Sequence, residues 1–150
     1  MSISVEFQKR LQELVNEQPP QTQSSLAQAI NVSPHTLSLA MLYGIVPKPA
    51  TLAHFADYFD VSIKYLLGQT DDLFYRKANS PSTFHERLCE LLKERKLTRY
   101  QLAKKCHFDK SSISHWFKKH QTPNWEIFDL LTDYFNVSPD YLLGRTDDRN

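Results

Sequence analysis

The sequence predicts an all-α protein built from two similar five-helix domains in tandem. The chain repeats itself, because residues 22–72 align with 98–148 without a gap and 17 of these 51 positions are identical. Helix-start residues and apolar residues at helical spacing follow in the same order in both copies. Only three glycines occur in 150 residues, and no alternating run of strand length interrupts the pattern. Two copies of this size indicate two small domains rather than a solenoid, which needs three or more short repeats.

The five helices of the second copy are each marked by a start signal. Ser, Thr and Asp accept hydrogen bonds from the first free amides of a helix, and Pro is tolerated in its first turn. The expected starts are Ser82 or Thr83, Thr98, Asp109, the Thr122-Pro123 break and Ser138-Pro139, with Gly144 as the final stop. The first copy repeats this order with Thr22, Ser33-Pro34, Pro47, Ser62 and Gly68.

Apolar residues at 3.6-residue spacing give each helix of the second copy an inner face. In helix order, the side chains expected inside are Phe84, Leu88, Leu91 and Leu92; Leu102, Ala103 and Cys106; Ile113 and Trp116; and Ile127, Phe128, Leu131 and Phe135.

The domain boundaries follow from the repeat. We assign residues 1–72 to the first domain, 73–83 to a linker and 84–150 to the second domain. The aromatic start of the linker, Leu73 to Tyr75, is expected to dock on one of the domains, and its polar, proline-marked end to be extended or flexible. The repeated Asp-Asp pairs at 71–72 and 147–148 are interpreted as turn residues after the last helix.

The net charge of +1 conceals a strong local charge. Residues 84–121 carry ten basic and four acidic groups, a net charge of +6, whereas residues 122–150 carry two basic and six acidic groups. A +6 segment of this length indicates binding to a polyanion. The alternative is a solvated helical surface balanced by its acidic neighbour.

Residues 98–119 predict two short helices around a three-residue turn. His107 lies in the turn, where the first copy has Asn31, and both residue types are enriched at left-handed backbone positions. With the inner positions assigned, basic and short hydrogen-bonding side chains remain outward on the second of these helices, as the major groove of DNA requires. They are Lys110, Ser111, Ser112, Ser114, His115, Lys118 and Lys119.

Each copy resembles the helix-turn-helix domain of the Cro and lambda-repressor group, also called the xenobiotic-response-element family. The second copy carries this pattern in Thr98, Leu102-Ala103, Phe108-Asp109, Ser112-Ile113-Ser114, Pro123 and Val137-Ser138 through Tyr141 to Gly144. The resemblance covers nearly the whole chain apart from the linker and the termini. It implies two lambda-repressor-like five-helix domains and sequence-specific binding of duplex DNA, commonly as a dimer that regulates transcription.

The resemblance also assigns roles to residues of the second copy. Arg99 replaces the family's usual Gln at a phosphate-contacting position. Base-reading positions are held by Lys110, Ser111, Ser112 and His115, where lysine contacts guanine and histidine contacts guanine or cytosine. Phosphate positions are held by Lys118, Lys119, Gln121 and Asn124. The alternative for any one of these lysines is a solvated side chain.

The first copy keeps the scaffold and loses this reading surface. Residues 21–47 contain no Lys, Arg, Asp or Glu, so little counterion release is available for DNA binding. A cluster of apolar residues replaces the charges and indicates a protein contact, either a dimer interface or a partner site. This apolar patch consists of Leu39, Met41, Leu42, Tyr43, Ile45 and Val46. The alternative is that these residues pack into the core or against the second copy.

Other classes of function find little support. His85 and Cys89 lie four residues apart, but only Cys106 and His107 are available to complete a metal site, so we expect no metal and no cofactor. Neither a phosphate-binding glycine loop nor a Gly-x-Ser-x-Gly motif is present, and we expect no enzyme. The chain has no apolar run long enough for a membrane span and starts without signal-peptide features, so we expect no membrane partner and a cytoplasmic location.

We therefore expect a repressor-like transcriptional regulator that binds double-stranded DNA. Its second domain reads the DNA, and its first domain forms a homodimer or binds a partner protein. Two alternatives remain: both domains contact DNA as a pseudo-dimer within one chain, or the chain is an interaction protein of the antitoxin or anti-repressor type.

Overall fold

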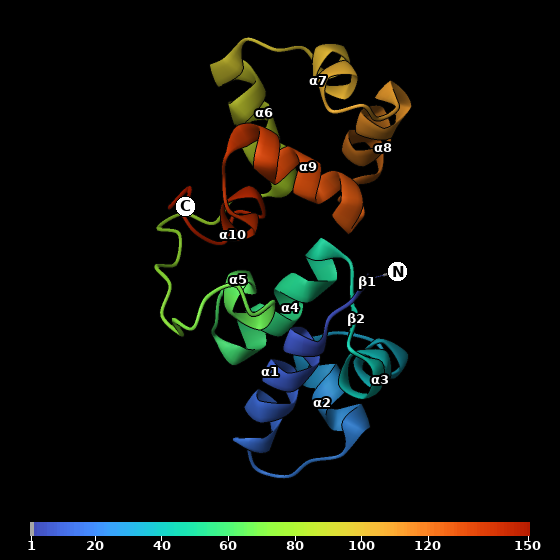
Figure 1. Cartoon of the computed structure of the whole chain (residues 1–150), viewed down its shortest axis with the longest axis vertical. Coiled ribbons are helices and arrows are strands. Elements are labelled where there is room, and N and C mark those ends of the chain that lie inside the picture. The colour runs from blue at the N-terminus through green and yellow to red at the C-terminus, as the bar shows by residue number, and fades with distance from the viewer. Residues whose placement is uncertain (1) are drawn as a thin grey trace. The chain divides into compact units, whose positions relative to one another are not determined.

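The computed structural model describes residues 2–150, which divide into two compact units, residues 2–75 and 76–150 (Figure 1). Over the described residues each unit contains five helices, so the predicted all-α class is confirmed. The N-terminal unit comprises β1 (Ser2–Ile3), α1 (Val5–Asn16), α2 (Gln23–Ile30), α3 (Pro34–Tyr43), β2 (Ile45–Val46), α4 (Pro49–Phe59) and α5 (Ile63–Leu66). The C-terminal unit comprises α6 (Phe84–Arg95), α7 (Arg99–Lys105), α8 (Lys110–Lys119), α9 (Trp125–Phe135) and α10 (Pro139–Leu142).

Side-chain caps fix where the helices begin. Thr83, rather than Ser82, caps α6, and Thr98 forms a full capping box with Gln101 at the start of α7. Such a cap typically stabilises a helix by about 1 kcal/mol. Further capping side chains start α2, α3, α5, α8, α9 and α10, namely Thr22, Ser33, Ser62, Asp109, Asn124 and Ser138.

The core of the C-terminal unit is formed by the predicted apolar faces. Leu88, Leu102, Ile113 and Phe128 come from four different helices and are fully buried, and Trp116 is 5% exposed. Each fully buried apolar side chain contributes about 1.5–3 kcal/mol. This packing holds α7 and α8 at a fixed crossing and leaves the opposite side of α8 in solvent.

A two-residue ribbon in the N-terminal unit was not predicted. Ser2 pairs with Val46 and Ile3 with Ile45 in antiparallel register. Gly44 (φ +68°) ends α3, and its carbonyl accepts a hydrogen bond of 2.8 Å from the Ser4 amide. A Cβ at Gly44 would lie 2.7 Å from the Ser4 oxygen, so the close approach requires glycine. A pairing this short leaves no alternating pattern that sequence analysis could detect.

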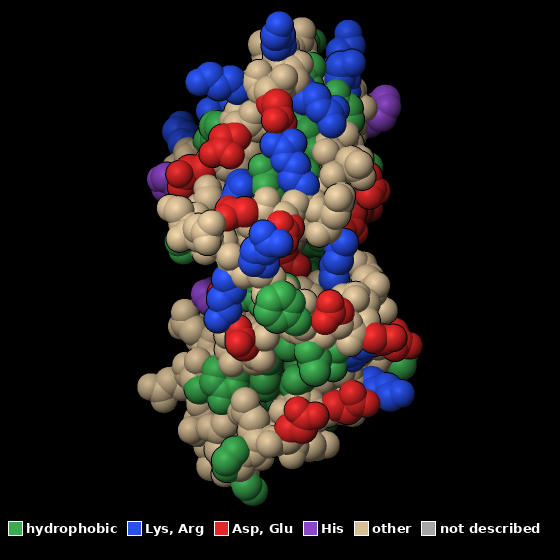
Figure 2. Space-filling view, turned by 90° about the vertical axis from the view of Figure 1, so that its left-hand side faces the viewer, with side chains coloured by type: hydrophobic (Ala, Val, Ile, Leu, Met, Phe, Trp, Pro, Cys, Tyr) green, Lys and Arg blue, Asp and Glu red, His purple; other side chains and the backbone are tan. Residues whose placement is uncertain are grey.

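The surfaces of the two units differ. Figure 2 shows one face of each, with lysine and arginine side chains gathered over the upper, C-terminal unit. The N-terminal unit shows fewer basic side chains and more hydrophobic surface on the face that is drawn. The contrast follows from the sequence, because the +6 segment belongs to α6, α7 and α8.

The segment between the predicted domains departs from the expectation in part. Residues 76–82, hereafter the strap, are bound to the end of the C-terminal unit: the Arg76 carbonyl accepts from the Thr146 hydroxyl at 2.6 Å, and the Ala78 amide donates to the Arg145 carbonyl at 3.0 Å. Of the three side chains expected to dock, Leu73 and Phe74 are 55% and 77% exposed, whereas Tyr75 is half-buried. The strap is held through backbone groups, which its polar side-chain sequence does not reveal.

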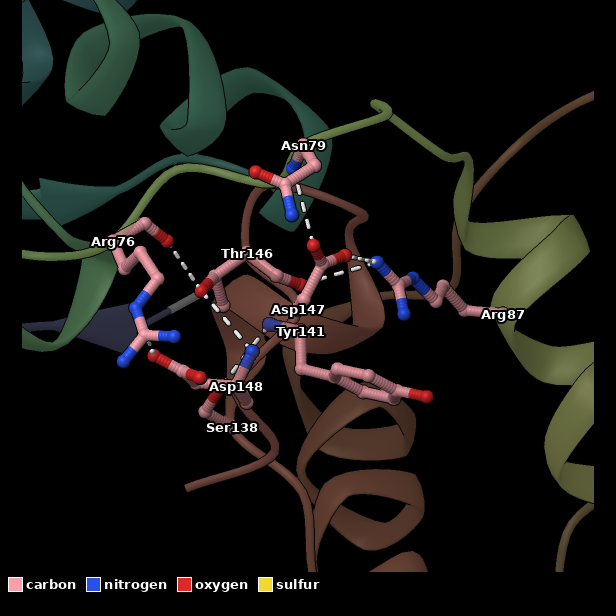
Figure 3. Close-up of polar contacts among 8 residues, drawn as sticks. All are labelled: Arg76, Asn79, Arg87, Ser138, Tyr141, Thr146, Asp147 and Asp148. Atoms are coloured by element: carbon pink, nitrogen blue, oxygen red, sulfur yellow. Dashed lines mark hydrogen bonds and ion pairs between the residues drawn. The ribbon is translucent and has the colours of Figure 1, made fainter.

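The repeated Thr-Asp-Asp segments do more than form turns, because each supplies acceptors for an arginine of the unit's first helix. In the C-terminal unit, Arg87 donates from Nη2 to the Thr146 carbonyl at 3.1 Å and to Asp147 Oδ1 at 3.0 Å (Figure 3). Its guanidinium carbon lies 4.2 Å from the centre of the Tyr141 ring. We call Arg87, Tyr141, Thr146 and Asp147 the arginine clasp of this unit.

The N-terminal unit repeats the clasp. Arg10 donates to the Thr70 carbonyl at 2.8 Å and to Asp71 Oδ1 at 2.6 Å, and its guanidinium carbon lies 4.2 Å from the Tyr65 ring centre. Both clasps tie the first helix of a unit to the residues that follow its last helix. The repeated Thr-Asp-Asp segment therefore has a structural role in both units. Sequence analysis did not predict that Arg10 and Arg87 bind to it.

Candidate nucleic-acid interface

The helices α7 and α8 are joined by the predicted turn. His107 has φ +59°, and Asn31 in the first copy has φ +72°, so both adopt the expected left-handed conformation. The Phe108 amide donates to the Ala103 carbonyl at 3.0 Å, which closes the end of α7. Asp109 then caps α8 by accepting a hydrogen bond from the Ser111 amide at 3.1 Å.

The outer face of α8 carries the predicted reading residues. Its buried side is formed by Ile113 and Trp116, which fixes which side chains point away from the core. Ser112 is half-buried, and the other members of the predicted set on this helix are exposed: Lys110, Ser111, Ser114, His115, Lys118 and Lys119. The structure thus brings three lysines, a histidine and short hydroxyl side chains onto one exposed helix.

The predicted phosphate contacts flank this helix. Arg99 is exposed at the start of α7, and its guanidinium carbon lies 3.7 Å from the centre of the Phe117 ring. A stacked guanidinium keeps its N–H edge free for a phosphate oxygen. Gln121 is exposed beyond the end of α8, and exposed Asn124 also caps α9 through its side-chain oxygen at 3.1 Å from the Ile127 amide.

Three residues of this region were not predicted from sequence. Tyr100 is 57% exposed, and the Lys110 ammonium lies 5.4 Å from the centre of its ring. Phe117 supports Arg99, and His85 contacts the end of α8. Phe117 and His85 could have been found by comparing the two copies, because the first copy has Met41 and Gln8 at these positions.

The corresponding helix of the N-terminal unit is uncharged. Leu42 and Tyr43 are 64% and 62% exposed at the end of α3. The remaining members of the predicted apolar patch are half-buried: Leu39, Met41, Ile45 and Val46. Ile3 and Val5, at 69% and 71% exposure, add apolar surface beside the ribbon. Sequence analysis missed these two because they precede the repeated region.

The remaining candidate chemistry is explained by packing. His85 bonds to backbone carbonyls, and burial raises the pKa of the Cys106 thiol, which keeps it protonated at neutral pH. Among residues 2–150, no group of three or more His, Cys, Asp or Glu side chains is arranged to hold a metal ion. None of the helices in the described chain combines the length and the apolar character of a membrane span.

Comparisons with known proteins agree with this geometry. Residues 90–142 match the model of the helix-turn-helix family. Over 63 residues the chain is 40% identical to a protein of Bacillus subtilis (strain 168) described as the uncharacterized HTH-type transcriptional regulator YobD. That match covers 42% of this chain and 56% of the relative, so the chain spans little more than half of the relative's length. No solved structure matches. The predicted resemblance to helix-turn-helix regulators is confirmed for residues 90–142, and the resemblance of the first copy stays a prediction.

Proposed function

We propose that the chain is a sequence-specific DNA-binding regulator of transcription, because residues 90–142 match the helix-turn-helix family. The observation that carries the proposal is the outer face of α8, where cations and short hydrogen-bonding side chains are exposed beside a rigid α7. A helix of this composition fits the major groove of B-form DNA. We place its action in the cytoplasm, without a cofactor and without catalysis.

In this proposal the first turns of α8 read the bases. Lys110 donates to guanine O6 or N7, and His115 donates to guanine or accepts from cytosine. Ser111, Ser112 and Ser114 provide short donors and acceptors that allow a close approach to base edges. A well-placed side chain of this kind discriminates between bases by about 1–3 kcal/mol.

The phosphate backbone anchors the same helix. Arg99 lies at the start of α7, and Lys118 and Lys119 lie in the last turn of α8. Gln121 and Asn124 add polar donors beyond its end. Each neutralised phosphate lowers log K by about 0.9 per unit of log salt concentration, so the salt slope counts the contacts of Arg99, Lys118 and Lys119 and not those of the two amides.

We assign the N-terminal unit to the assembly of a homodimer or, failing that, to a partner protein. The apolar patch lies on α3, the helix that corresponds to α8, and on the following strand β2, and residues 21–47 contain no Lys, Arg, Asp or Glu. A face without cations releases few counterions from DNA, so it gains little binding free energy there. The same face can approach a second copy of the chain without charge repulsion. Paired chains would occupy two half-sites and repress by blocking the site.

Selection of bound sequences from a random duplex library with the full-length chain tests the proposal. The expected result is a motif with two related half-sites, which is lost when Lys110 and His115 are both replaced by Ala. Salt dependence separates the alternatives. A slope of about six phosphates per chain, which the +6 charge of residues 84–121 can neutralise, would support the C-terminal unit alone, and about twice that number would support both units. A chain that binds no duplex at all would favour the interaction-protein alternative.

A further inference from the structure

A histidine of α6 ties the first helix of the C-terminal unit to the end of α8. The Nε2 atom of His85 lies 3.0 Å from the Trp116 carbonyl oxygen and 3.0 Å from the Gln121 carbonyl oxygen. Because both partners are acceptors, Nε2 carries the hydrogen and donates it to both. The Trp116 carbonyl also accepts hydrogen bonds from the amides of His120 and Gln121, which close the end of α8. The shared His85 donor adds a side-chain tie from α6 to this exit.

The His85 ring also supports the aromatic residue on which Arg99 rests. Its ring centre lies 5.4 Å from that of Phe117, at an edge-on angle of 69°. Phe117 also packs against the core and carries the guanidinium carbon of Arg99 at 3.7 Å from its ring centre. Residues from three helices therefore form one stack, and its outermost member is a cation that points at the proposed phosphate path.

We infer that His85 is a positioning residue for DNA binding. It acts through the two carbonyls on Lys118 and Lys119, and through Phe117 on Arg99, without touching the DNA itself. This inference rests on the proposed function, because the groups it positions are the proposed phosphate anchors. Their alignment before binding reduces the ordering cost that flexible basic side chains otherwise incur.

The N-terminal unit shows which part of this arrangement is scaffold. Gln8, which corresponds to His85, donates from Nε2 to the Met41 carbonyl at 3.1 Å and to the Leu42 carbonyl at 2.9 Å. The tie between the two helices is thus present in both units. Met41 and Gln23 replace Phe117 and Arg99, so the cation stack belongs to the C-terminal unit.

Three variants of the full-length chain test the inference. His85→Ala removes the donor, His85→Gln restores an Nε2 donor of the kind used by Gln8, and Cys89→Ala alters an exposed residue one turn later on the same helix. Binding is measured with a fluorescein-labelled, mixed-sequence duplex of about 20 base pairs at about 50 mM salt, and the salt slope is recorded. Amide hydrogen exchange at residues 117–121 reports on the end of α8 without DNA.

We expect His85→Ala to bind the duplex about 5- to 20-fold more weakly, with a salt slope lower by about one to two, as if one or two phosphate contacts were lost. Exchange at residues 117–121 should rise while exchange in the core of α6 stays unchanged. His85→Gln should bind within about threefold of the unmodified chain, and Cys89→Ala should match it.

Two results would overturn the inference: a folded His85→Ala chain with unchanged affinity and slope, or His85→Gln as weak as His85→Ala. A failure of the proposed function gives a different result, because then the unmodified chain fails to bind the duplex. The exchange measurement would still show whether His85 holds the end of α8.

Discussion

The third helices of the two units, α3 and α8, occupy the same place in the repeat and present opposite surfaces. Both are packed against the preceding helix and tied to the first helix of their unit, by Gln8 in one case and His85 in the other. The arginine clasp also recurs in both units. On the outer side, α8 ends with Lys118 and Lys119 where α3 has Leu42 and Tyr43.

This difference separates what holds the fold from what determines the surface. Buried apolar positions, caps and clasps are shared, so the scaffold tolerates a complete change of the outward residues. Exposed side chains contribute little to stability, because substitutions there usually change it by less than about 0.5 kcal/mol. The outward residues are therefore free to specify a ligand, and the two units are best tested by changing those positions in pairs.

The largest expected effect comes from reversing the charges at the end of α8. Lys118→Glu combined with Lys119→Glu replaces two proposed phosphate contacts by repulsion, and we expect duplex affinity to fall by about 100-fold or more. The measurement is fluorescence anisotropy at low salt, with far-ultraviolet circular dichroism to verify folding. Unaltered affinity in the folded variant would remove α8 from the DNA interface.

The matching change in α3 tests the other half of the comparison. Leu42→Glu combined with Tyr43→Glu places charges in the apolar patch, and we expect the assembled protein to fall to the mass of one 17.5 kDa chain. Light scattering after size-exclusion chromatography measures the mass. Binding of a single half-site should be retained. A single-chain mass for the unmodified protein would exclude the homodimer and leave the partner protein as the occupant of the patch.

Sequence reasoning predicted the parts of this structure that depend on local patterns. Thr98, Asp109 and Ser138 start helices because their side chains cap free amides, and Ile113 and Trp116 lie inside because of helical spacing. Once the inner side of α8 was assigned, the exposed positions of Lys118 and its neighbours followed. These inferences need no knowledge of how distant segments meet.

The parts that were missed depend on contacts between distant segments. His85 bonds to backbone carbonyls more than 30 residues away, and the strap bonds through its own backbone, so side-chain patterns carry little sign of either. Arg87 was counted with the basic residues of the +6 segment, although it is 8% exposed and bound to the end of the unit. The alignment of Arg87 with Arg10 could have shown that Arg87 differs from the solvent-exposed basic residues of this segment.

Replacing the clasp arginines compares how much each clasp contributes to the stability of its own unit. Arg87→Ala leaves the Thr146 carbonyl without this donor and removes the cation from Tyr141, so we expect the unfolding free energy of the C-terminal unit to fall by about 2 kcal/mol. Arg10→Ala should cost the N-terminal unit about 1 kcal/mol, because the side chain of its partner Asp71 is 99% exposed.

Both tryptophans, Trp116 and Trp125, lie in the C-terminal unit, so their fluorescence during urea unfolding follows that unit alone. Circular dichroism follows both units together. If Arg10→Ala and Arg87→Ala lower the unfolding free energies of their units equally, the greater burial of Arg87 does not add to the stability of the C-terminal unit.

The smallest expected effect concerns acid and the second clasp. Hydrogen bonds from the Asn79 amide and from Arg87 lower the pKa of Asp147 below its ordinary value of 3.8. A carboxyl group with a lowered pKa stabilises the folded state above the ordinary value, and this contribution is lost as the pH falls toward the folded value. The tryptophan-monitored stability of the C-terminal unit should therefore decline below about pH 4.

Asp147→Asn should reduce that decline, at the cost of lower stability at neutral pH, because the uncharged amide no longer titrates. Asp148→Asn is the matched control: its carboxylate lies 3.8 Å from the Arg76 guanidinium and outside the clasp, so the acid sensitivity due to Asp147 should persist. Equal acid profiles for Asp147→Asn and the unmodified chain would show that the bond from the strap to Asp147 does not stabilise the unit. The strap would then be a connection that lies against the C-terminal unit without strengthening its clasp.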